Sequence, residues 1–266
     1  MPSIELTELE LELRRRLMPH LDTGIKLTVV ETIDSTNKQL KAQAVTSNQT
    51  LLLACQQTAG VGRRGSLWQS PPAGNLYLSY CVHSGRPLSE LSLWSLGVTV
   101  AVADALEREL SLECKIKWPN DLYLNGMKVG GVLLETASLP SDDVAVVIGV
   151  GLNVASHPDP ALLQRPVTCV SKHTDTSVDL SMVAAAVSAA LVDMCHLSHA
   201  ALLAWLMSSW PSRDMLLNQP VAVPTLGEGL GIARGLSHDG GLEVEFAGEL
   251  RTVYAGEVSL GHVDTQ

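Results

Sequence analysis

A glycine-rich segment in the first quarter of the chain carries two adjacent arginines. It runs from Gln57 to Gly65 with the letters QTAGVGRRG, and Trp68 follows three residues later. Glycines let backbone amides approach an oxyanion closely, and the guanidinium groups of Arg63 and Arg64 offer planar pairs of donors to a carboxylate or a phosphate. The pattern predicts a mobile anion-binding loop that Trp68 closes by packing over the ligand. A solvated surface turn is the alternative.

The three glycines Gly60, Gly62 and Gly65 also have the G-x-G-x-x-G spacing of dinucleotide-binding proteins. In those proteins the glycines open a helix, and an acidic residue about 20 positions further on binds the ribose. Here the chain continues as SLWQSPP, which does not begin a helix, and residues 78–81 read LSYC without an acid. We therefore reject dinucleotide binding.

A second motif, KWPND at residues 117–121, combines a lysine, an amide and a carboxylate. The pair Asn125-Gly126 that follows predicts a tight hairpin, which folds Lys128 back beside this motif. Two cations and one carboxylate would then converge, and such a group suits a nucleoside triphosphate with its Mg²⁺ ion. Lysines placed at a strand edge to prevent aggregation are the alternative.

A third motif, GVGLN at residues 149–153, closes an apolar run. Its glycines let a ring lie against the backbone, and Asn153 offers both a donor and an acceptor. A bulge or a tight turn explains the same residues equally well.

Covalent and metal chemistry have no comparable pattern. No serine–histidine–aspartate or cysteine–histidine arrangement indicates a nucleophile, and Cys195, His196 and His199 lack a fourth metal ligand nearby. The five cysteines are scattered without a C-x-x-C pair, which argues against a disulfide framework and a zinc ribbon. We predict no fixed metal site in the protein.

Charge is unevenly distributed over the 266 residues, whose net charge is −10. Residues 1–131 hold 13 acids and 13 bases, whereas residues 132–266 hold 15 acids and 5 bases. Nucleic acid is a poor general partner, because phosphate binding needs a basic face. One stretch of the neutral half gathers basic residues, which indicates a small anionic ligand. These residues are Arg63, Arg64, Lys115, Lys117 and Lys128.

The composition is that of a globular protein, with 46% hydrophobic and 17% charged residues, and it excludes disordered, collagen-like and coiled-coil proteins. No run approaches the roughly 20 apolar residues of a membrane helix. The first residues are acidic, unlike the basic start of a secretory signal. We expect a cytoplasmic protein without a membrane partner.

The elements that must position these motifs include both helices and strands. A capping box at Thr7 and Glu10 begins a helix that ends before Pro19. We expect further helices at 36–44, 92–110, 180–195 and 198–209, and strands at 25–30, 51–54, 76–82, 113–118, 121–124, 129–134 and 144–150. Short β runs follow at 220–225, 230–235, 242–247 and 251–254, and their glycine-rich turns are typical of a small antiparallel barrel. This order predicts an α+β fold with domains 1–217 and 218–266.

Taken in order, five motifs resemble those of biotin protein ligases. They are the DSTN of residues 34–37, the loop from Gln57 to Trp68, the KWPND of residues 117–121, Lys128 with Gly131, and the GVGLN of residues 149–153. The resemblance covers about residues 25–265, since the GEVSL of residues 256–260 is similar to the family's last strand. It implies a central mixed β-sheet with flanking helices, similar to class II synthetases, and a small C-terminal SH3-like β-barrel.

The resemblance also implies an ATP-dependent ligase that works in two steps. The biotin carboxylate attacks the α-phosphate of Mg-ATP and gives biotinyl-5′-AMP and pyrophosphate. A specific lysine of the biotin carboxyl carrier protein of acetyl-CoA carboxylase then attacks the mixed anhydride. ATP with Mg²⁺ and biotin are substrates, and no tightly bound cofactor is implied. Because both reactants of the first step are anions, fixed cations and amide donors matter more than covalent catalysis.

The same motifs imply a role for each site residue. Arg63 and Lys128 would be catalytic, holding the biotin carboxylate and the α-phosphate as charge develops, while Trp68 would shield the anhydride from water. The residues implied in biotin binding are Ser35, Thr36, Asn37, Gln57, Gly60, Val61, Gly62, Arg63, Trp68, Lys128, Gly131 and Gly149. The residues implied in nucleotide binding are Arg63, Arg64, Asn120, Asp121 and Asn153.

Two loop positions depart from the family pattern. Val61 and Ser66 stand where biotin protein ligases usually have basic residues, so the loop carries fewer cations than the resemblance implies. We expect the loop to hold the adenylate less tightly, while the chemistry survives through Arg63.

Some relatives also repress transcription through an added winged helix-turn-helix domain, which needs at least three helices. One capped helix fits ahead of the first expected strand, so we expect a ligase without a DNA partner. Lipoate or octanoate transfer on the same fold and a non-catalytic biotin-responsive regulator are the alternatives. A homodimer through a sheet edge stays open.

Overall fold

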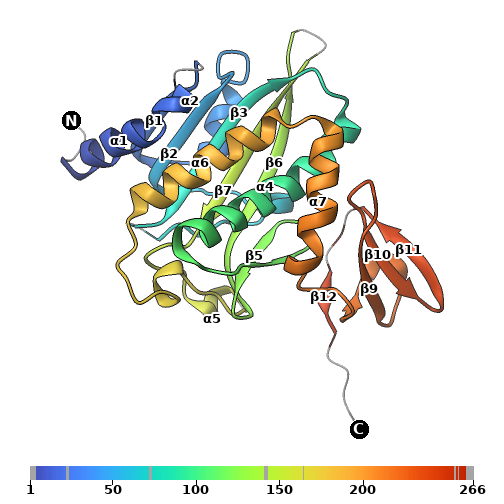
Figure 1. Cartoon of the computed structure of the whole chain (residues 1–266). Helices are drawn as coiled ribbons and strands as arrows, with labels where there is room; N and C mark the ends of the chain where they lie inside the picture. Colours follow the sequence, from blue (N-terminus) through green and yellow to red (C-terminus); the bar gives the residue numbers. More distant parts are fainter. Residues whose placement is uncertain are drawn as a thin grey trace.

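A seven-stranded mixed β-sheet forms the centre of the larger part of the chain (Figure 1). The computed structural model describes residues 4–21, 24–71, 74–140, 143–163, 165–254, 256 and 258–261. The strands are β1 (Lys26–Ile33), β2 (Thr50–Gln57), β3 (Leu76–Ser84), β4 (Lys115–Lys117), β5 (Asp121–Leu124), β6 (Met127–Ser138) and β7 (Val144–Leu152). Their order is β1-β2-β3-β7-β6-β5-β4, in which β1 and β2 are parallel and the other neighbours antiparallel. The predicted central mixed sheet is confirmed.

Helices cover the two faces of this sheet unequally. The long helices α4 (Leu88–Leu110), α6 (Leu180–His196) and α7 (His199–Arg213) cover one face, whereas the short helix α3 (Thr36–Ala42) packs against β2, β3, β6 and β7. Successive side chains of a strand point to opposite faces. In β7, Val146 and Ile148 therefore join the large core with α4 and α6, while Ala145 and Val147 join a small core with α3. Because α3 is short, it covers only part of its face.

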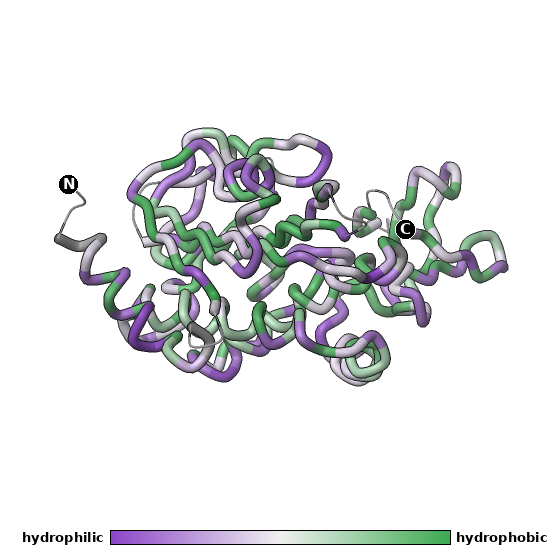
Figure 2. Tube along the Cα trace, turned by 90° about the horizontal axis from the view of Figure 1, so that it is seen from above, coloured by the Kyte–Doolittle hydropathy of each residue, from purple (hydrophilic) through white to green (hydrophobic). Residues whose placement is uncertain are grey.

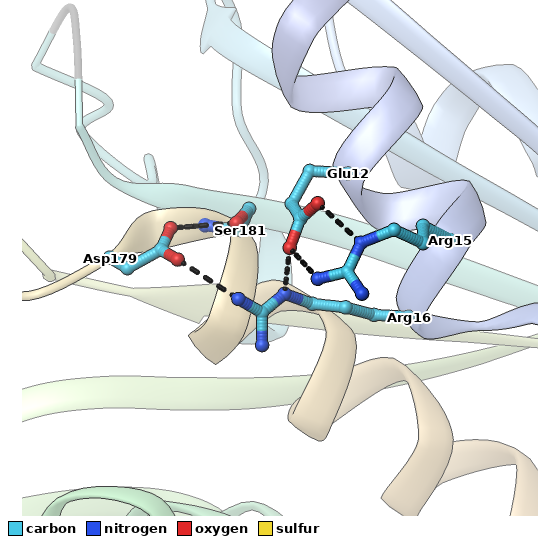
Figure 3. A network of polar contacts seen from close by, with 5 residues as sticks. All are labelled: Glu12, Arg15, Arg16, Asp179 and Ser181. Atoms are coloured by element: carbon cyan, nitrogen blue, oxygen red, sulfur yellow. Dashed lines mark hydrogen bonds and ion pairs between the residues drawn. The ribbon is translucent and has the colours of Figure 1, made fainter.

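The helix α1 (Ile4–Arg16) is attached to the edge of this layer by both apolar and polar contacts. Leu13 on α1 and Leu17, the residue that follows the helix, are fully buried. Figure 3 shows the polar contacts: Glu12 accepts hydrogen bonds from Arg15 and Arg16, and Arg16 also bonds Asp179, the N-cap residue of α6. These ion pairs are largely exposed and each adds little stability, so burial of the leucines holds the helix in place.

Of the local signals in the sequence, the capping box at Thr7 and Glu10 is wrong, because α1 already begins at Ile4, whereas the signals at Ser35 and at Asn125-Gly126 agree with the structure. Ser35 caps α3 as expected, because its hydroxyl oxygen accepts a hydrogen bond from the Lys38 amide at 3.4 Å. Asn125 and Gly126 have positive φ angles of 48° and 76°, the conformation that a two-residue type I′ hairpin needs. This hairpin joins β5 to β6 and brings the two strands into antiparallel register.

The predicted end of the last long helix is wrong. The helix expected at 198–209 continues through Pro211 and ends at Arg213. Arg213 is buried against α4, where its guanidinium bonds Asp104 and Glu107. These long-range contacts hold the last turn in helical form although Pro211 cannot donate a backbone hydrogen bond.

The C-terminal part forms a separate antiparallel sheet at one end of the elongated molecule, opposite the N-terminus (Figure 2). Its strands are β8 (Pro220–Ala222), β9 (Gly231–Leu236), β10 (Leu242–Phe246), β11 (Glu249–Val253) and β12 (Ser259–Leu260), in the order β11-β10-β9-β8-β12. The strand expected at 220–225 ends early, because Pro224 begins a 3-10 turn. The Trp118 indole N–H donates to the Gly240 carbonyl at 3.1 Å, which joins this sheet to the KWPND motif.

The described residues show neither a metal cluster nor a membrane helix. No group of three histidine, cysteine, aspartate or glutamate side chains among them could hold a metal ion. The five cysteines are free. No described helix is long and apolar enough to cross a bilayer.

Removing the side chain of Leu13 should destabilise the protein, because this leucine anchors α1 in the core. For Leu13→Ala we expect the free energy of unfolding to fall by about 2–5 kcal/mol, the usual range for a buried leucine. Leu11 lies on the same helix and is 62% exposed, so Leu11→Ala is the matched control and should change stability by less than about 0.5 kcal/mol. Urea unfolding measures both. Equal effects would contradict the packing of α1.

Candidate active site

A cavity of about 1000 Å³ opens on the face of the sheet that α3 only partly covers. Its wall includes the start of α3, the end of β2, the glycine-rich loop, the KWPND turn, β6 and the end of β7. A segment after α5 (Pro160–Leu163) and residues of the C-terminal part complete the wall. The predicted site residues that line it are Ser35, Thr36, Asn37, Gln57, Val61, Gly62, Arg63, Arg64, Trp68, Asn120, Asp121, Lys128, Gly131 and Gly149. The structure therefore brings most of the three sequence motifs together, and their individual roles stay predictions.

The cavity is strongly cationic although the whole protein has a net charge of −10. Its described lining includes five cations and a single carboxylate, Asp121. The cations are Arg63, Arg64, Lys117, Lys128 and Arg165. Walls of low dielectric concentrate the field of such a group. The cavity is therefore suited to a ligand with several negative charges.

Glycines form part of the floor of this cavity. By alternation along β7, Gly149 and Gly151 point to the same face as the residues under α3. A Cβ atom at Gly149 would lie 2.3 Å from Asn37 Oδ1, and one at Gly151 would lie 2.5 Å from Trp68 Cε2. Larger residues at these two positions would displace the Asn37 and Trp68 side chains. The observed packing therefore requires glycine at both positions.

The glycine-rich loop folds back on itself as a small hairpin. Trp68 N–H donates to the Gly60 carbonyl at 2.9 Å, and Gly62 N–H donates to the Ser66 carbonyl at 2.7 Å. Gly60, at the base of this hairpin, does not line the cavity. At the tip, Arg64 takes a positive φ of 54°. The hairpin thus turns the two arginines toward the cavity.

Arg63 and Trp68 connect this loop to the other motifs. The Arg63 guanidinium donates to Asn120 Oδ1 at 3.4 Å, and Asn120 in turn donates to the Val132 carbonyl. The Trp68 ring lies against Gly151, and Lys128 Nζ is 5.6 Å from its centroid, within the range of a cation–π contact. The Trp68 indole N–H is buried without a hydrogen-bond partner among the described residues.

Lys128 lies at the base of the cavity, paired with Asp121. Its Nζ atom donates to Asp121 Oδ1 at 2.5 Å, and the residue is 7% exposed. The hairpin geometry predicted from Asn125-Gly126 is therefore confirmed. Burial lowers the pKa of Lys128 most, Asp121 opposes that effect, and the nearby charges of Arg165 and Lys117 lower the pKa further. The site thus holds its central cation at a cost in free energy that a bound anion would relieve.

A polar group lines the opposite end of the cavity, at the start of α3. The Thr36 N–H donates to Gln57 Oε1 at 2.9 Å, and the Gln57 amide donates to Ser70 at 3.3 Å. Asn37 bonds Ser79 at 2.6 Å and Glu135 at 3.1 Å. These contacts fix side chains that would otherwise rotate, which preorganises the site for a polar ligand.

Asn153 lies behind the lining rather than in it. It is 3% exposed, and its amide donates to the Thr168 carbonyl at 3.0 Å. Its Oδ1 atom is buried without a hydrogen-bond partner among the described residues. Its predicted contact with the nucleotide stays a prediction.

Sequence motifs missed the segment after α5, which lines the cavity with Leu162, Leu163 and Arg165. This segment is tied to Lys128, whose N–H donates to the Pro166 carbonyl at 3.1 Å, while the Thr168 N–H donates to the Lys128 carbonyl at 2.9 Å. Arg165 is one of five basic residues in the acidic half of the chain. This low number of basic residues is the sequence feature that could have indicated Arg165 as an anion-binding residue. The C-terminal residues in the wall, which no motif indicated, are Pro224, Gly256, Val258 and Ser259.

Comparison with known proteins agrees with the geometry. Residues 29–153 match the Biotin/lipoate A/B protein ligase family, and residues 216–261 match the Biotin protein ligase C terminal domain. The chain is 32% identical to the biotin--[acetyl-CoA-carboxylase] ligase of Paracoccus denitrificans, over 86% of this chain and 98% of that protein. The chain belongs to the biotin protein ligase family. The predicted family and the α+β fold with a β-rich C-terminal part are confirmed.

Other members of the biotin protein ligase family are similar over most of the chain. The bifunctional ligase/repressor BirA of Escherichia coli is 32% identical over 92% of this chain and 77% of its own length. Among solved structures, the biotin protein ligase of Aquifex aeolicus in complex with biotin and ATP has a TM-score of 0.71 and 28% identity, and the match covers 90% of this chain and 99% of that one.

The lowered pKa of Lys128 predicts how anion binding changes with pH. An anion needs the charged ammonium, so affinity for inorganic pyrophosphate should fall as the pH rises through this pKa, at lower pH than an exposed lysine would give. Lys128→Arg keeps the charge in alkaline solution and should move the fall to higher pH. Titration calorimetry from neutral to alkaline pH measures this, with Lys115→Arg as a control outside the cavity. Identical profiles for wild type and Lys128→Arg would contradict the assignment.

Proposed function

We propose that this biotin protein ligase activates biotin with ATP and then transfers it to a lysine of the biotin carboxyl carrier protein of acetyl-CoA carboxylase. The observation that carries the proposal is the cavity with five cations and one carboxylate, since both biotin and ATP are anions. Two relatives are named as biotin--[acetyl-CoA-carboxylase] ligases, which points to acetyl-CoA carboxylase as the target.

In the proposed first step, a carboxylate oxygen of biotin attacks the α-phosphorus of ATP. The bond from that phosphorus to the bridging oxygen of the β-phosphate breaks, and pyrophosphate leaves with its electron pair. Lys128 and Arg63 stabilise the charge that develops between the two reactants, and fixed charges of this kind lower the barrier because they need no reorganisation. Mg²⁺ would come with the nucleotide and neutralise its phosphates. Asp121, whose Oδ1 accepts from Lys128, is the one carboxylate in the described lining and would be the residue to hold the ion.

In the proposed second step, the amine of the carrier lysine attacks the acyl carbon of biotinyl-5′-AMP. An amide bond forms, AMP leaves with the electron pair of the broken carbon–oxygen bond, and the amine loses a proton. The mixed anhydride is prone to hydrolysis, so exclusion of water is essential. The Trp68 ring beside Lys128 supports the role of this loop as a cover.

The polar end of the cavity favours biotin over lipoate or octanoate. Biotin ends in a cyclic urea with donors and an acceptor, whereas the hydrocarbon and dithiolane ends of the other two acids cannot satisfy such groups. The hydroxyls of Ser35 and Thr36 and the Gln57 amide line this end. Buried polar groups left unpaired disfavour the wrong ligand strongly. The match of residues 216–261 to the C-terminal domain of biotin protein ligases points the same way.

The expected lack of a DNA partner and the possible homodimer stay predictions. Ahead of β1 the structure describes α1 and the four-residue helix α2 (Met18–Leu21). The five free cysteines are consistent with the proposed cytoplasmic location, where thiols stay reduced.

Release of pyrophosphate on mixing biotin with ATP tests the proposal, and a non-catalytic regulator would release none. Lys128→Ala removes the central cation and should slow this release by on the order of 10²-fold. Lys115 is an exposed lysine on β4 outside the cavity, so Lys115→Ala is the matched control and should act like wild type. A coupled pyrophosphate assay measures all three proteins. Wild-type rates in Lys128→Ala would rule out the proposed role.

A change at Val61 tests whether the missing loop cation loosens the intermediate. Val61 lines the cavity next to Gly62 and Arg63, so Val61→Arg places a further cation close to the bound adenylate. We expect biotinyl-5′-AMP to dissociate about tenfold more slowly, the effect of one added charge-assisted contact. Stopped-flow release of preformed intermediate measures the rate. Unchanged or faster release would contradict the expectation.

A further inference from the structure

A chain of hydrogen bonds runs behind the polar end of the cavity, from the protein surface to Thr36. Lys41 Nζ pairs with Glu135 Oε1 at 2.8 Å, and Glu135 Oε2 accepts from Asn37 Nδ2 at 3.1 Å. The Ser79 hydroxyl donates to Asn37 Oδ1 at 2.6 Å, and its oxygen lies 2.7 Å from the Thr36 hydroxyl. Glu135 and Ser79 do not line the cavity, whereas Asn37 and Thr36 do. The chain therefore connects a carboxylate outside the site to side chains inside it.

The register of the sheet explains why these groups meet. Gly149 of β7 is flanked by Ser79 of β3 and Leu133 of β6. Asn37 sits directly above this row, because a Cβ atom at Gly149 would lie 2.3 Å from its Oδ1. Glu135 is two residues beyond Leu133 and points to the same face. Asn37 is thus enclosed by fixed neighbours on three strands.

Glu135 determines which way the Asn37 amide points. An ionised carboxylate only accepts hydrogen bonds, and so does the Leu133 carbonyl, which lies 3.5 Å from Asn37 Nδ2. Both acceptors face the NH₂ group of Asn37, so its Oδ1 atom must face Ser79. A flipped amide would set its oxygen against two other acceptors.

This orientation decides the direction of the hydroxyl bonds. A hydroxyl has one proton, and the Ser79 proton is used on Asn37 Oδ1. The Thr36 hydroxyl oxygen lies 2.7 Å from Ser79 Oγ and 3.1 Å from Gln57 Oε1. Gln57 Oε1 already accepts the Thr36 backbone N–H, whereas the shorter contact with Ser79 has no other proton, so Thr36 donates its proton to Ser79. The Thr36 oxygen therefore keeps only lone pairs for the cavity and acts as an acceptor.

Ser35, next to it, has the opposite character. Its oxygen accepts the Lys38 N–H as the cap of α3, at 3.4 Å, which leaves its hydroxyl proton for an acceptor in the cavity. A donor at Ser35 beside an acceptor at Thr36 complements a carbonyl beside an N–H, which is the edge of a cyclic urea.

We propose that Glu135 is a positioning residue that sets the donor and acceptor pattern of the biotin pocket through Asn37, Ser79 and Thr36. The proposal rests on the proposed function, because it concerns the urea ring of biotin. Glu135→Gln has nearly the same shape but adds an NH₂ group that can donate to Asn37 Oδ1. The Asn37 amide is then free to flip, Ser79 donates to Thr36, and Thr36 loses its fixed role as an acceptor.

The test compares biotin and ATP affinities of wild type and Glu135→Gln by calorimetry. Biotin should bind about tenfold more weakly to the variant, the effect of one lost hydrogen bond, whereas ATP affinity should stay within about twofold, since ATP contacts other residues. Lys41→Met is the matched control, because it removes the paired cation but keeps the carboxylate. It should bind biotin within about twofold of wild type.

A double-mutant cycle with Ser79→Ala separates a relay from two independent structural effects. In a relay, Glu135→Gln/Ser79→Ala should bind biotin no more weakly than Ser79→Ala alone. Thermal unfolding of each variant checks that the fold is kept.

Two results would overturn the proposal: unchanged biotin affinity in Glu135→Gln, with or without a loss of thermal stability, or fully additive losses in the double variant. Failure of the proposed function is distinguishable, because the wild type itself would then not bind biotin.

Discussion

Positive charges held close together repel one another, and this protein gathers five of them around one cavity. The central one, Lys128, is also buried, so its ammonium lacks most of the water that would stabilise it. One ion pair with Asp121 and one ring contact with Trp68 offset part of this cost. Apolar packing in the core beneath the sheet offsets the rest of this unfavourable free energy, because it holds the Lys128 backbone in place. A ligand that brings negative charge relieves the repulsion, and this is why the structure favours binding two anions side by side.

The architecture serves this arrangement by leaving one face of the sheet partly open. Three long helices close the other face and provide most of the apolar burial, whereas α3 covers only one end of the open face. Its N-terminus supplies the polar end of the cavity, and the hairpin of β5 and β6 supplies the cationic end. Gly149 and Gly151 have no side chains, so the surface of the sheet between the two ends leaves space for a ligand and for the Trp68 ring.

Sequence patterns predicted the parts of the site that depend on local geometry. Asn125-Gly126 permits only a narrow range of turns, so the meeting of Lys128 and Asp121 follows from neighbouring residues alone. The contact of Arg165 with the same cavity depends on backbone pairing between distant segments, and no local pattern encodes it. The bonds from Glu135 to Asn37 and from Asn37 to Ser79 depend on strand register, which periodicity does not fix. The continuation of α7 past Pro211 likewise depends on a distant contact of Arg213.

The two ends of the cavity differ in chemistry, because Ser35 and Thr36 line one end and Arg63 and Lys128 line the other. A crystal structure with a non-hydrolysable analogue of biotinyl-5′-AMP tests this most directly. We predict that the anionic linkage lies within about 3.2 Å of Lys128 Nζ and of the Arg63 guanidinium, with the urea ring at Ser35 and Thr36. A linkage that points into solvent, or a ring bound at the cationic end, would contradict it.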